Sequence, residues 1–201
     1  IYDIDYKNRT YDQRLGYVYS KDKFQLYASG AYHTMHQKMD LDRVMVIDNK
    51  YNNILPEISM NYEYKKGSNV RLRYERETSL PNVNQASPVV NDFNPLYISQ
   101  GNANLTPEES DEYSLRAYSH DFKSAGSFFT YFNYTKTSNA IVTNRTIDDN
   151  YVQYSTYQNY GSKSTVRGVI HFSKKINSIG LRYTTRISAN TSDYFTIIDD
   201  A

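Results

Sequence analysis

Apolar and polar residues alternate with a period of two along most of the chain, which is the pattern of β-strands with two different faces. In residues 69–78 the apolar and charged positions fall on opposite faces: Val70, Leu72 and Tyr74 against Arg71, Arg73, Glu75 and Glu77. The same alternation recurs in residues 57–66, 164–172 and 180–189. No segment has a convincing 3.6-residue period, so the sequence predicts an all-β protein.

The alternation predicts an antiparallel meander of about eight long strands. These lie near residues 10–20, 24–37, 53–66, 69–80, 109–121, 126–142, 151–173 and 178–193. The seventh segment is also compatible with two shorter strands broken near Gly161. Several segments exceed the ~5–6 residues of a usual globular strand and match the ~9–11 residues of a tilted membrane-spanning strand.

The connections between these strands alternate in length. Short turns rich in Lys, Gly, Asn, Asp and Ser lie at residues 20–23, 65–69, 120–126 and 174–178, and longer links lie at about 38–52, 81–108 and 143–150. In an antiparallel meander, all short turns then fall at one end of the sheet and all long links at the other. Outer-membrane barrels have this layout, with short periplasmic turns and long extracellular loops.

The two faces of the predicted sheet differ in chemistry. Aromatic residues gather beside the short turns, as in an interfacial girdle or in cross-strand pairs of a soluble sheet: Tyr17, Tyr19, Phe24, Tyr62, Tyr64, Tyr118, Phe122, Phe128 and Phe172. The opposite face carries charges deep inside strands: Arg14, Arg71, Arg73, Glu75, Arg116, Arg167, Arg182 and Arg186. In a wide barrel such a face lines a wet lumen while the apolar face meets lipid.

Composition removes several classes of function. The formal net charge is +1, from 23 basic and 22 acidic residues, which argues against a nucleic-acid binder that relies on bulk charge. The chain has no cysteine, so it has neither disulfides nor thiolate metal sites, and it has no apolar run of the ~20 residues that a membrane helix needs. Since the chain starts without Met and ends within a strand pattern, we expect a segment of a longer protein.

We find no catalytic or metal-binding motif. The sequence contains no G-x-S-x-G, no glycine-rich phosphate loop and no H-E-x-x-H. His33 and His36 are three residues apart, so a strand would point them to opposite faces, and the acidic run at 107–112 does not have the spacing of a calcium loop. We therefore predict that the chain is not an enzyme and holds neither metal nor cofactor.

An ordered series of motifs between residues 55 and 116 carries a family resemblance. Leu55 and Pro56 open a strand, Arg and Tyr alternate from 71 to 74, and "QASP" at 85–88 follows Pro81. Then come Asn94 and Pro95, and "GNANLTPE" at 101–108 leads into the next strand. The series resembles the TonB-dependent receptors of Bacteroidetes, in the branch called the outer membrane protein beta-barrel family. Ala103 and Thr106 depart from the family's usual Pro and Lys at these positions.

The resemblance implies a place in the cell and a set of partners. Residues 1–201 would be part of an outer-membrane barrel of 22 strands, in a receptor that takes up a siderophore, glycan or peptide. The remaining strands and an N-terminal plug domain would lie elsewhere in the parent chain, which would couple to the TonB complex. Expected contacts are outer-membrane lipid and the plug, but no nucleic acid, and open strand edges of an isolated fragment would favour oligomers.

Two groups of residues are candidates for function. Arg71, Arg73, Glu75 and Arg116 would face the lumen and contact the plug or a solute, or serve only in lumen solvation and ion pairing. The loop motif is expected to be architectural, because its prolines restrict the backbone, Gly101 permits a positive φ and Leu105 packs the loop down. Its residues are Pro81, Pro88, Pro95, Gly101, Asn102, Asn104, Leu105, Pro107 and Glu108.

Two other architectures remain open at this stage. The first is a soluble β-sandwich that binds carbohydrate, with exposed tyrosines as stacking platforms. The second is a complete eight-stranded barrel with a structural or adhesive role, whose interior would be filled with side chains. The sandwich would bury Ile58, Val70, Leu72 and Ile170 between two layers, whereas the membrane barrel would leave them facing lipid.

Overall fold

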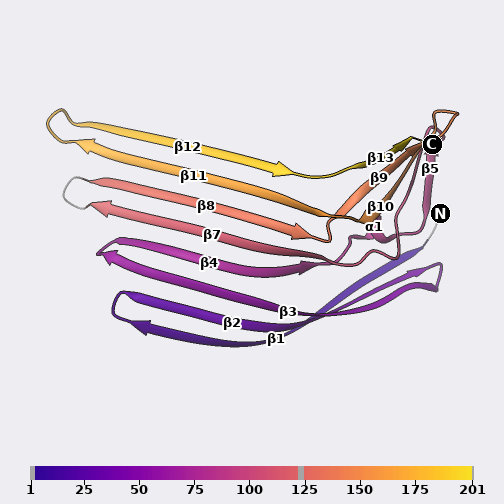
Figure 1. The fold of residues 1–201 in the computed structure, drawn as a ribbon, viewed down its shortest axis with the longest axis horizontal. Coiled ribbons are helices and arrows are strands. Elements are labelled where there is room, and N and C mark those ends of the chain that lie inside the picture. The colour runs from indigo at the N-terminus through magenta and orange to yellow at the C-terminus, as the bar shows by residue number, and fades with distance from the viewer. Residues whose placement is uncertain (1–2, 122–124, 201) are drawn as a thin grey trace.

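A long antiparallel sheet of eight strands forms the body of the molecule in the computed structural model, which describes residues 3–121 and 125–200 (Figure 1). The strands lie in the order β1 (Ile4–Lys21), β2 (Phe24–Leu41), β3 (Val44–Lys65), β4 (Ser68–Ser79), β7 (Glu108–Asp121), β8 (Gly126–Ser138), β11 (Ser162–Ile176) and β12 (Leu181–Asp193). Each strand pairs with its neighbours antiparallel, so the predicted meander is confirmed. Within the described ranges β1 and β12 are open edges, so this is not a closed eight-stranded barrel.

A second, smaller sheet and the helix lie at the end away from the short turns (Figure 1). The order of this sheet is β13 (Ile197–Asp200), β9 (Ile141–Ile147), β10 (Gln153–Asn159), β6 (Tyr97–Gln100) and β5 (Val90–Asn94). The single turn of helix, α1 (Val83–Ala86), begins with a capping box in which Asn82 and Gln85 exchange side-chain and backbone hydrogen bonds. No helix in the described residues is long and apolar enough to cross a membrane.

Two predicted boundaries were wrong, and the structure decides a third that was left open. The predicted long link at 38–52 is instead an extension of β2 and β3 that closes in a tight turn, with Asp42 and Arg43 at φ of 49° and 68°. The segment 126–142 divides into β8 and β9 at Asn139, whose φ is 55°. The segment 151–173 divides into β10 and β11 at Gly161, which confirms the alternative of two strands. Positive φ breaks the ladder at each point, and only one of the four residues is a glycine.

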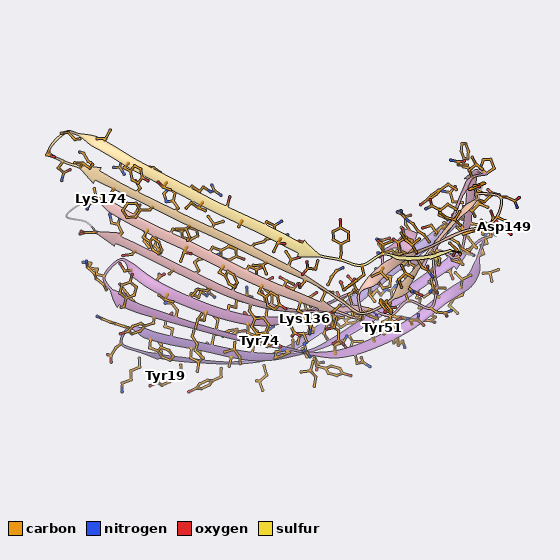
Figure 2. All side chains as sticks on the ribbon, turned by 45° about the horizontal axis from the view of Figure 1, so that its top comes forward. Tyr19, Tyr51, Tyr74, Lys136, Asp149 and Lys174 are labelled. Carbon is orange, nitrogen blue, oxygen red and sulfur yellow. The ribbon has the colours of Figure 1, made fainter. Side chains whose placement is uncertain are left out.

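The densest packing lies at the long-link end and not under the middle of the large sheet. Met39 and Ile47 of the β2–β3 extension form a buried cluster with Ala86 of α1, and Met35 and Leu105 are also buried. Figure 2 shows side chains crowded at this end, near Tyr51 and Asp149, whereas Tyr19 and Lys174 mark the end with the short turns. The β4–β7 connection therefore forms a second layer over one end of the sheet.

The apolar side of the large sheet has no such cover. Ile58, Leu72 and Ile170 are 42%, 50% and 47% exposed, and Val70 is half-buried. A sandwich would have placed these side chains between two layers, and the described residues provide no second layer on this side. The exposed apolar surface is what a membrane barrel requires and a water-soluble sandwich does not.

Candidate functional site

The strand register gathers the charged residues onto one face of the large sheet. Directly opposed residues of antiparallel neighbours point to the same side, and Glu57 opposes Glu75 while Arg71 opposes Arg116. Followed from strand to strand, the pairing places all eight charged positions on this side, here called the polar face: Arg14, Arg71, Arg73, Glu75, Arg116, Arg167, Arg182 and Arg186. Alternation along each strand was thus sufficient to group them.

Glu57 is the centre of an ion-pair network on the polar face. Its Oε2 lies 2.6 Å from Nη1 of Arg14, and its Oε1 lies 2.8 Å from Nη2 of Arg73. Arg73 also donates from Nε to Glu57 Oε1 at 3.0 Å, and its Nη2 lies 2.7 Å from Oε2 of Glu75. The network joins β1, β3 and β4, and it crosses β2 where Arg14 donates to Ser29 Oγ at 3.4 Å.

Sequence reasoning missed Glu57 although its signal was present. The alternation in residues 57–66 places Glu57 two positions from Ser59, on the side of Asn61 and Glu63. Only 13% of its side chain is exposed, so it is the most enclosed carboxylate of the network. A cavity of about 220 Å³ lies beside it, lined by Asp12, Arg14, His33, Leu55, Pro56, Glu57, Glu75, Arg76, Glu77 and Thr78.

Arg71 and Arg116, two of the four predicted site residues, have no carboxylate partner within the described residues. Arg71 donates from Nε to Ser59 Oγ at 3.0 Å, and the guanidinium carbon of Arg116 lies 5.6 Å from the ring centroid of Tyr131. The two arginines oppose each other across β4 and β7, so their positive charges add on this part of the face. Arg73 and Glu75, by contrast, pair with each other.

The histidines form short pairs and not a cluster. His33 contacts Asp12 on the polar face, and His36 contacts Asp48 on the other face of the β2–β3 extension. The hydrogen bond with His36, followed by that with Lys38, holds the pKa of Asp48 below its ordinary value of 3.8. Within residues 3–121 and 125–200, no group of three His, Asp or Glu side chains could hold a metal ion.

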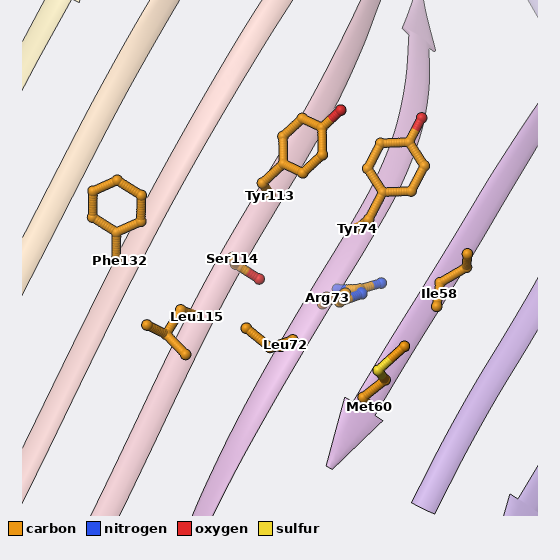
Figure 3. Close-up of a pocket in the computed structure, with 9 residues that line it drawn as sticks. All are labelled: Ile58, Met60, Leu72, Arg73, Tyr74, Tyr113, Ser114, Leu115 and Phe132. Carbon is orange, nitrogen blue, oxygen red and sulfur yellow. The ribbon is translucent and has the colours of Figure 1, made fainter.

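The opposite side of the sheet, here called the apolar face, contains a broad groove of about 500 Å³ (Figure 3). Ile58 and Met60 of β3, Leu72 and Tyr74 of β4, Tyr113 and Leu115 of β7, and Phe132 of β8 lie side by side along it. Arg73 and Ser114 also border the groove, but they alternate with these residues and belong to the polar face.

A sharp change of chemistry ends the apolar face on the side of the long links. Ring centroids of Tyr74 and Tyr113 lie 5.0 Å apart, and those of Tyr113 and Tyr134 lie 6.2 Å apart, so the three rings form a row across β4, β7 and β8. One step farther on the same face, Arg76 donates to Asp111 through Nε at 2.8 Å and Nη2 at 3.0 Å. Lys136 follows opposite Asp111 on β8.

The other end of the apolar face carries aromatic residues beside the short turns. The pairing places most of the predicted girdle there: Tyr17, Tyr19, Phe24, Tyr62, Phe128 and Phe172. Tyr64 lies beyond an irregularity in the β3–β4 pairing and is 44% exposed. Tyr118 was assigned wrongly, because it opposes Asn69 and Phe129 on the polar face. Phe122 lies outside the described residues.

The loop motif packs onto the polar face of the β1–β3 end. Pro81 and Leu105 are buried, the Pro81 carbonyl accepts from Tyr6 Oη at 2.5 Å, and the Leu105 carbonyl accepts from Tyr51 Oη at 3.3 Å. Burial raises the pKa of the Tyr51 phenol above its ordinary value of 10. Tyr6 and Tyr51 both lie on the polar face, so the connection folds toward that side of the sheet.

Gly101 is required for a reason other than the predicted one. Its φ is not among the positive values, but a Cβ atom at this position would lie 2.7 Å from the carbonyl oxygens of Asn84 and Gln85. The neighbouring Asn102 N–H donates to the Gln85 carbonyl at 2.7 Å, which holds the chain against α1. Close backbone approach, not backbone conformation, selects glycine here.

The rest of the motif joins two connections that are distant in sequence. Asn102 donates from Nδ2 to the Tyr157 carbonyl at 2.9 Å and accepts from the Asn104 N–H at 2.9 Å. Glu108 Oε1 accepts from the Ile141 N–H at 2.7 Å and from Lys163 Nζ at 2.8 Å. The Pro107 carbonyl accepts from Asn139 Nδ2 at 2.8 Å. These bonds tie the β4–β7 connection to the β8–β11 connection.

Two prolines of the motif shape the β5–β6 hairpin. The Pro88 carbonyl, just before β5, accepts from Gln100 Nε2 of β6 at 2.7 Å. Pro95 lies in the turn between the two strands, where Asn94 Oδ1 accepts from the Leu96 N–H at 3.1 Å. The hairpin thereby brings β6 alongside β10 of the second connection.

Comparison with known protein families gives a match to one family model over nearly the whole chain. Residues 10–199 match the model of the outer membrane protein beta-barrel family. A search of curated proteins found none that matches. The match extends well beyond the motif-bearing residues 55–116 and includes both sheets.

Proposed function

Because the chain belongs to the outer membrane protein beta-barrel family, we propose that it forms part of the transmembrane wall of a TonB-dependent receptor that takes up a large solute. Membership of the family places the protein in the bacterial outer membrane. The proposal gives residues 1–201 a mechanical and selective role in a longer chain that supplies the other strands and a plug domain. It assigns no bond-making step to this segment.

The observation that carries the proposal is the separation of the two faces of the large sheet. The apolar face is uncovered; it ends in a row of tyrosines on the side of the long links and in mixed Tyr and Phe residues beside the short turns, as expected where a barrel meets lipid. The polar face carries the Arg14–Glu57–Arg73–Glu75 network and unpaired Arg71 and Arg116, which require water. A wide, water-filled bore satisfies both requirements.

The height of the apolar face agrees with the thickness of an outer membrane. On β8 the span from Phe128 to Lys136 measures about 27 Å at ~3.4 Å per residue, and about 21 Å along the membrane normal at a tilt of ~40°. This is close to the ~25 Å apolar band of such barrels. The row of Arg76, Asp111 and Lys136 then lies at the headgroups of the outer leaflet, and the short turns lie in the periplasm.

An open, eight-stranded segment favours a wide barrel over a small pore. The polar side chains of adjacent strands pair along the wall, and β1 and β12 are left free to continue the ladder with further strands. Barrels of 22 strands enclose a plugged lumen that admits large solutes. Arg71, Arg73, Glu75 and Arg116 would then face the plug or the passing solute.

Adjacent residues of β4 provide a direct test of the lumen assignment in the full-length protein. Leu72→Cys and Arg73→Cys differ by one position and point to opposite faces. In outer-membrane vesicles, a charged maleimide should label the Arg73 variant after the plug is displaced by urea, and a lipid-soluble maleimide should label the Leu72 variant. Equal labelling of both positions by the charged reagent would contradict the proposal that β4 has one face toward lipid and one toward the lumen.

Coupling to energy requires a separate test. Site-specific photocrosslinking should join the periplasmic part of the full-length protein to TonB, and deletion of tonB should abolish uptake of its solute. A protein that shows the two-faced labelling but neither crosslinks to TonB nor depends on it would be an outer-membrane barrel of another class.

A further inference from the structure

A second cavity lies between the small sheet and the end of the large one. It has a volume of about 420 Å³ and is lined by Ile4 of β1, by Val83, Asn84, Ser87 and Val89 around α1, and by Asn91, Tyr97, Ser99, Gln100, Gly101 and Tyr157. Ile4 shares its side of β1 with Tyr6, so this wall of the cavity belongs to the polar face. The elements that line it, α1, β5, β6 and β10, lie at the end where the long connections gather (Figure 1).

Both walls of this cavity are fixed in place by the loop motif. Parallel pairing of β6 with β10 sets Tyr97, Ser99 and Tyr157 on one side of the small sheet, and Asn91 opposes Ser99 from β5. The facing wall is the α1 segment, held by the close approach of Gly101 to Asn84 and Gln85. The walls of the cavity are therefore formed mainly by the β4–β7 and β8–β11 connections together, and not by a single loop.

The lining has many hydrogen-bonding groups and no charge. Four of its polar groups have no partner in the described part of the chain: the Asn84 amide and the hydroxyls of Tyr97, Ser99 and Tyr157. No Asp, Glu, Lys, Arg or His lines the cavity. Two tyrosines supply ring faces in addition to hydroxyls.

We propose that this cavity binds a neutral sugar unit of the solute that the receptor takes up. A sugar ring presents hydroxyls to the amide and hydroxyl groups and C–H faces to the tyrosines, so it matches both kinds of lining. An anionic or metal-chelating solute would enter without any countercharge, which is costly in a partly enclosed site. A volume of about 420 Å³ is within the range of small-ligand pockets. The inference rests on the proposed function, because it names the solute class.

The experiment uses full-length protein in detergent and a panel of defined probes. Neutral gluco-, xylo-, manno- and galacto-oligosaccharides are compared with acidic galacturonate oligomers, a ferric catecholate chelate and a neutral peptide mixture, first on an array and then by calorimetry. Tyr97→Ala removes one ring and Asn84→Ala one amide. Tyr157→Phe removes only a hydroxyl and leaves the backbone contact to Asn102 intact. Tyr154→Ala is the matched control, since Tyr154 lies on the other side of β10.

We expect at least one neutral oligosaccharide to bind, with affinity reduced about tenfold or more by Tyr97→Ala and severalfold by the other two cavity variants. The Tyr154 variant should bind as the parent does. Binding of only the acidic, chelate or peptide probes would overturn the inference, as would sugar binding that the three cavity variants leave unchanged.

Uptake separates this inference from the proposed function. Cells with and without tonB receive the labelled sugar that binds. TonB-dependent uptake that Tyr97→Ala impairs supports both ideas. Sugar binding without TonB-dependent uptake would support the sugar site but contradict the proposed role as a TonB-dependent receptor. TonB-dependent uptake of a charged solute, without uptake of any neutral sugar, would support the receptor role and contradict the sugar site.

Discussion

A Cβ atom on Gly101 would lie 2.4 Å from the carbonyl oxygen of Ser87, a separation that real side chains essentially never show. Ser87 follows α1 and is itself buried, so its carbonyl has little freedom to move away. The contact fixes β6 and the "GNANLTPE" segment against the helix. It thereby sets the distance between β6 and the α1 segment.

Gly101→Ala should loosen the β4–β7 connection without opening the large sheet. We expect a loss of about 1–3 kcal/mol in local stability, because the added methyl group must displace backbone atoms. External protease should then cut the β4–β7 connection in outer-membrane vesicles faster than in the parent. Gly168→Ala on β11 is the control, since a Cβ there meets no atom within 4 Å. Equal rates of cleavage in the two variants would show that the Gly101 contact does not determine the local stability of the connection.

Particular residues show how far sequence alone reaches. Alternation was sufficient to assign the two faces, because Arg71 and Leu72 must point in opposite directions wherever a strand forms. It did not reveal the turn at Asp42–Arg43, since the polar and charged composition of residues 38–52 also fits a loop. Only the pairing of β2 with β3 shows that this segment is extended strand. The steric need for Gly101 depends on a backbone neighbour fourteen positions away, Ser87, which no local pattern encodes.

Leu105→Ala and Leu72→Ala form a matched pair for the two environments. Leu105 is 2% exposed under the loop layer, so its truncation leaves a cavity and should cost about 2–5 kcal/mol of the stability of that layer. Leu72 is 50% exposed on the apolar face, where lipid can fill the space, so its truncation should cost less. Hydrogen exchange of the amides in β6 and β10 measures the difference. A larger effect from Leu72 would contradict the burial pattern.

The two ion pairs of Glu57 should differ in strength. Arg73 uses both Nε and Nη2 on Glu57 and its side chain is 37% exposed, whereas Arg14 uses one nitrogen and is 47% exposed. Double-mutant cycles with Gln at each position should give coupling of about 1–2 kcal/mol for Arg73–Glu57 and ~0.5 kcal/mol for Arg14–Glu57. Unfolding of the full-length protein in urea with lipid vesicles provides the free energies. The reverse order would show that Arg14 dominates the network.

The tip of the β2–β3 extension should weaken in acid. Since the pKa of Asp48 is lowered in the folded state, its pairing with His36 and Lys38 is complete above pH ~4 and is lost as pH falls below its ordinary pKa of 3.8. We expect amide protection beside the Asp42–Arg43 turn to stay constant from pH 5 to pH ~4 and to fall as the pH drops from ~4 to ~2, after correction for intrinsic exchange rates. Asp48→Asn should be less protected at pH 5 and should change little over this range. A parallel pH response in both proteins would assign the effect to another group.

The open edges of the large sheet predict how the isolated 201-residue chain behaves. β1 and β12 each present one unpaired ladder of backbone N–H and C=O groups, and in lipid every such group must find a partner. Refolded into detergent, the chain should therefore form oligomers, in which β12 of one copy pairs with β1 of the next. A variant with cysteine at both Gln13 on β1 and Ile187 on β12 should form intermolecular disulfides that join position 13 of one copy to position 187 of the next. Variants with only one of these cysteines cannot form this disulfide within their own oligomers. A monodisperse monomer whose edge amides are protected would show that the edges close within one chain.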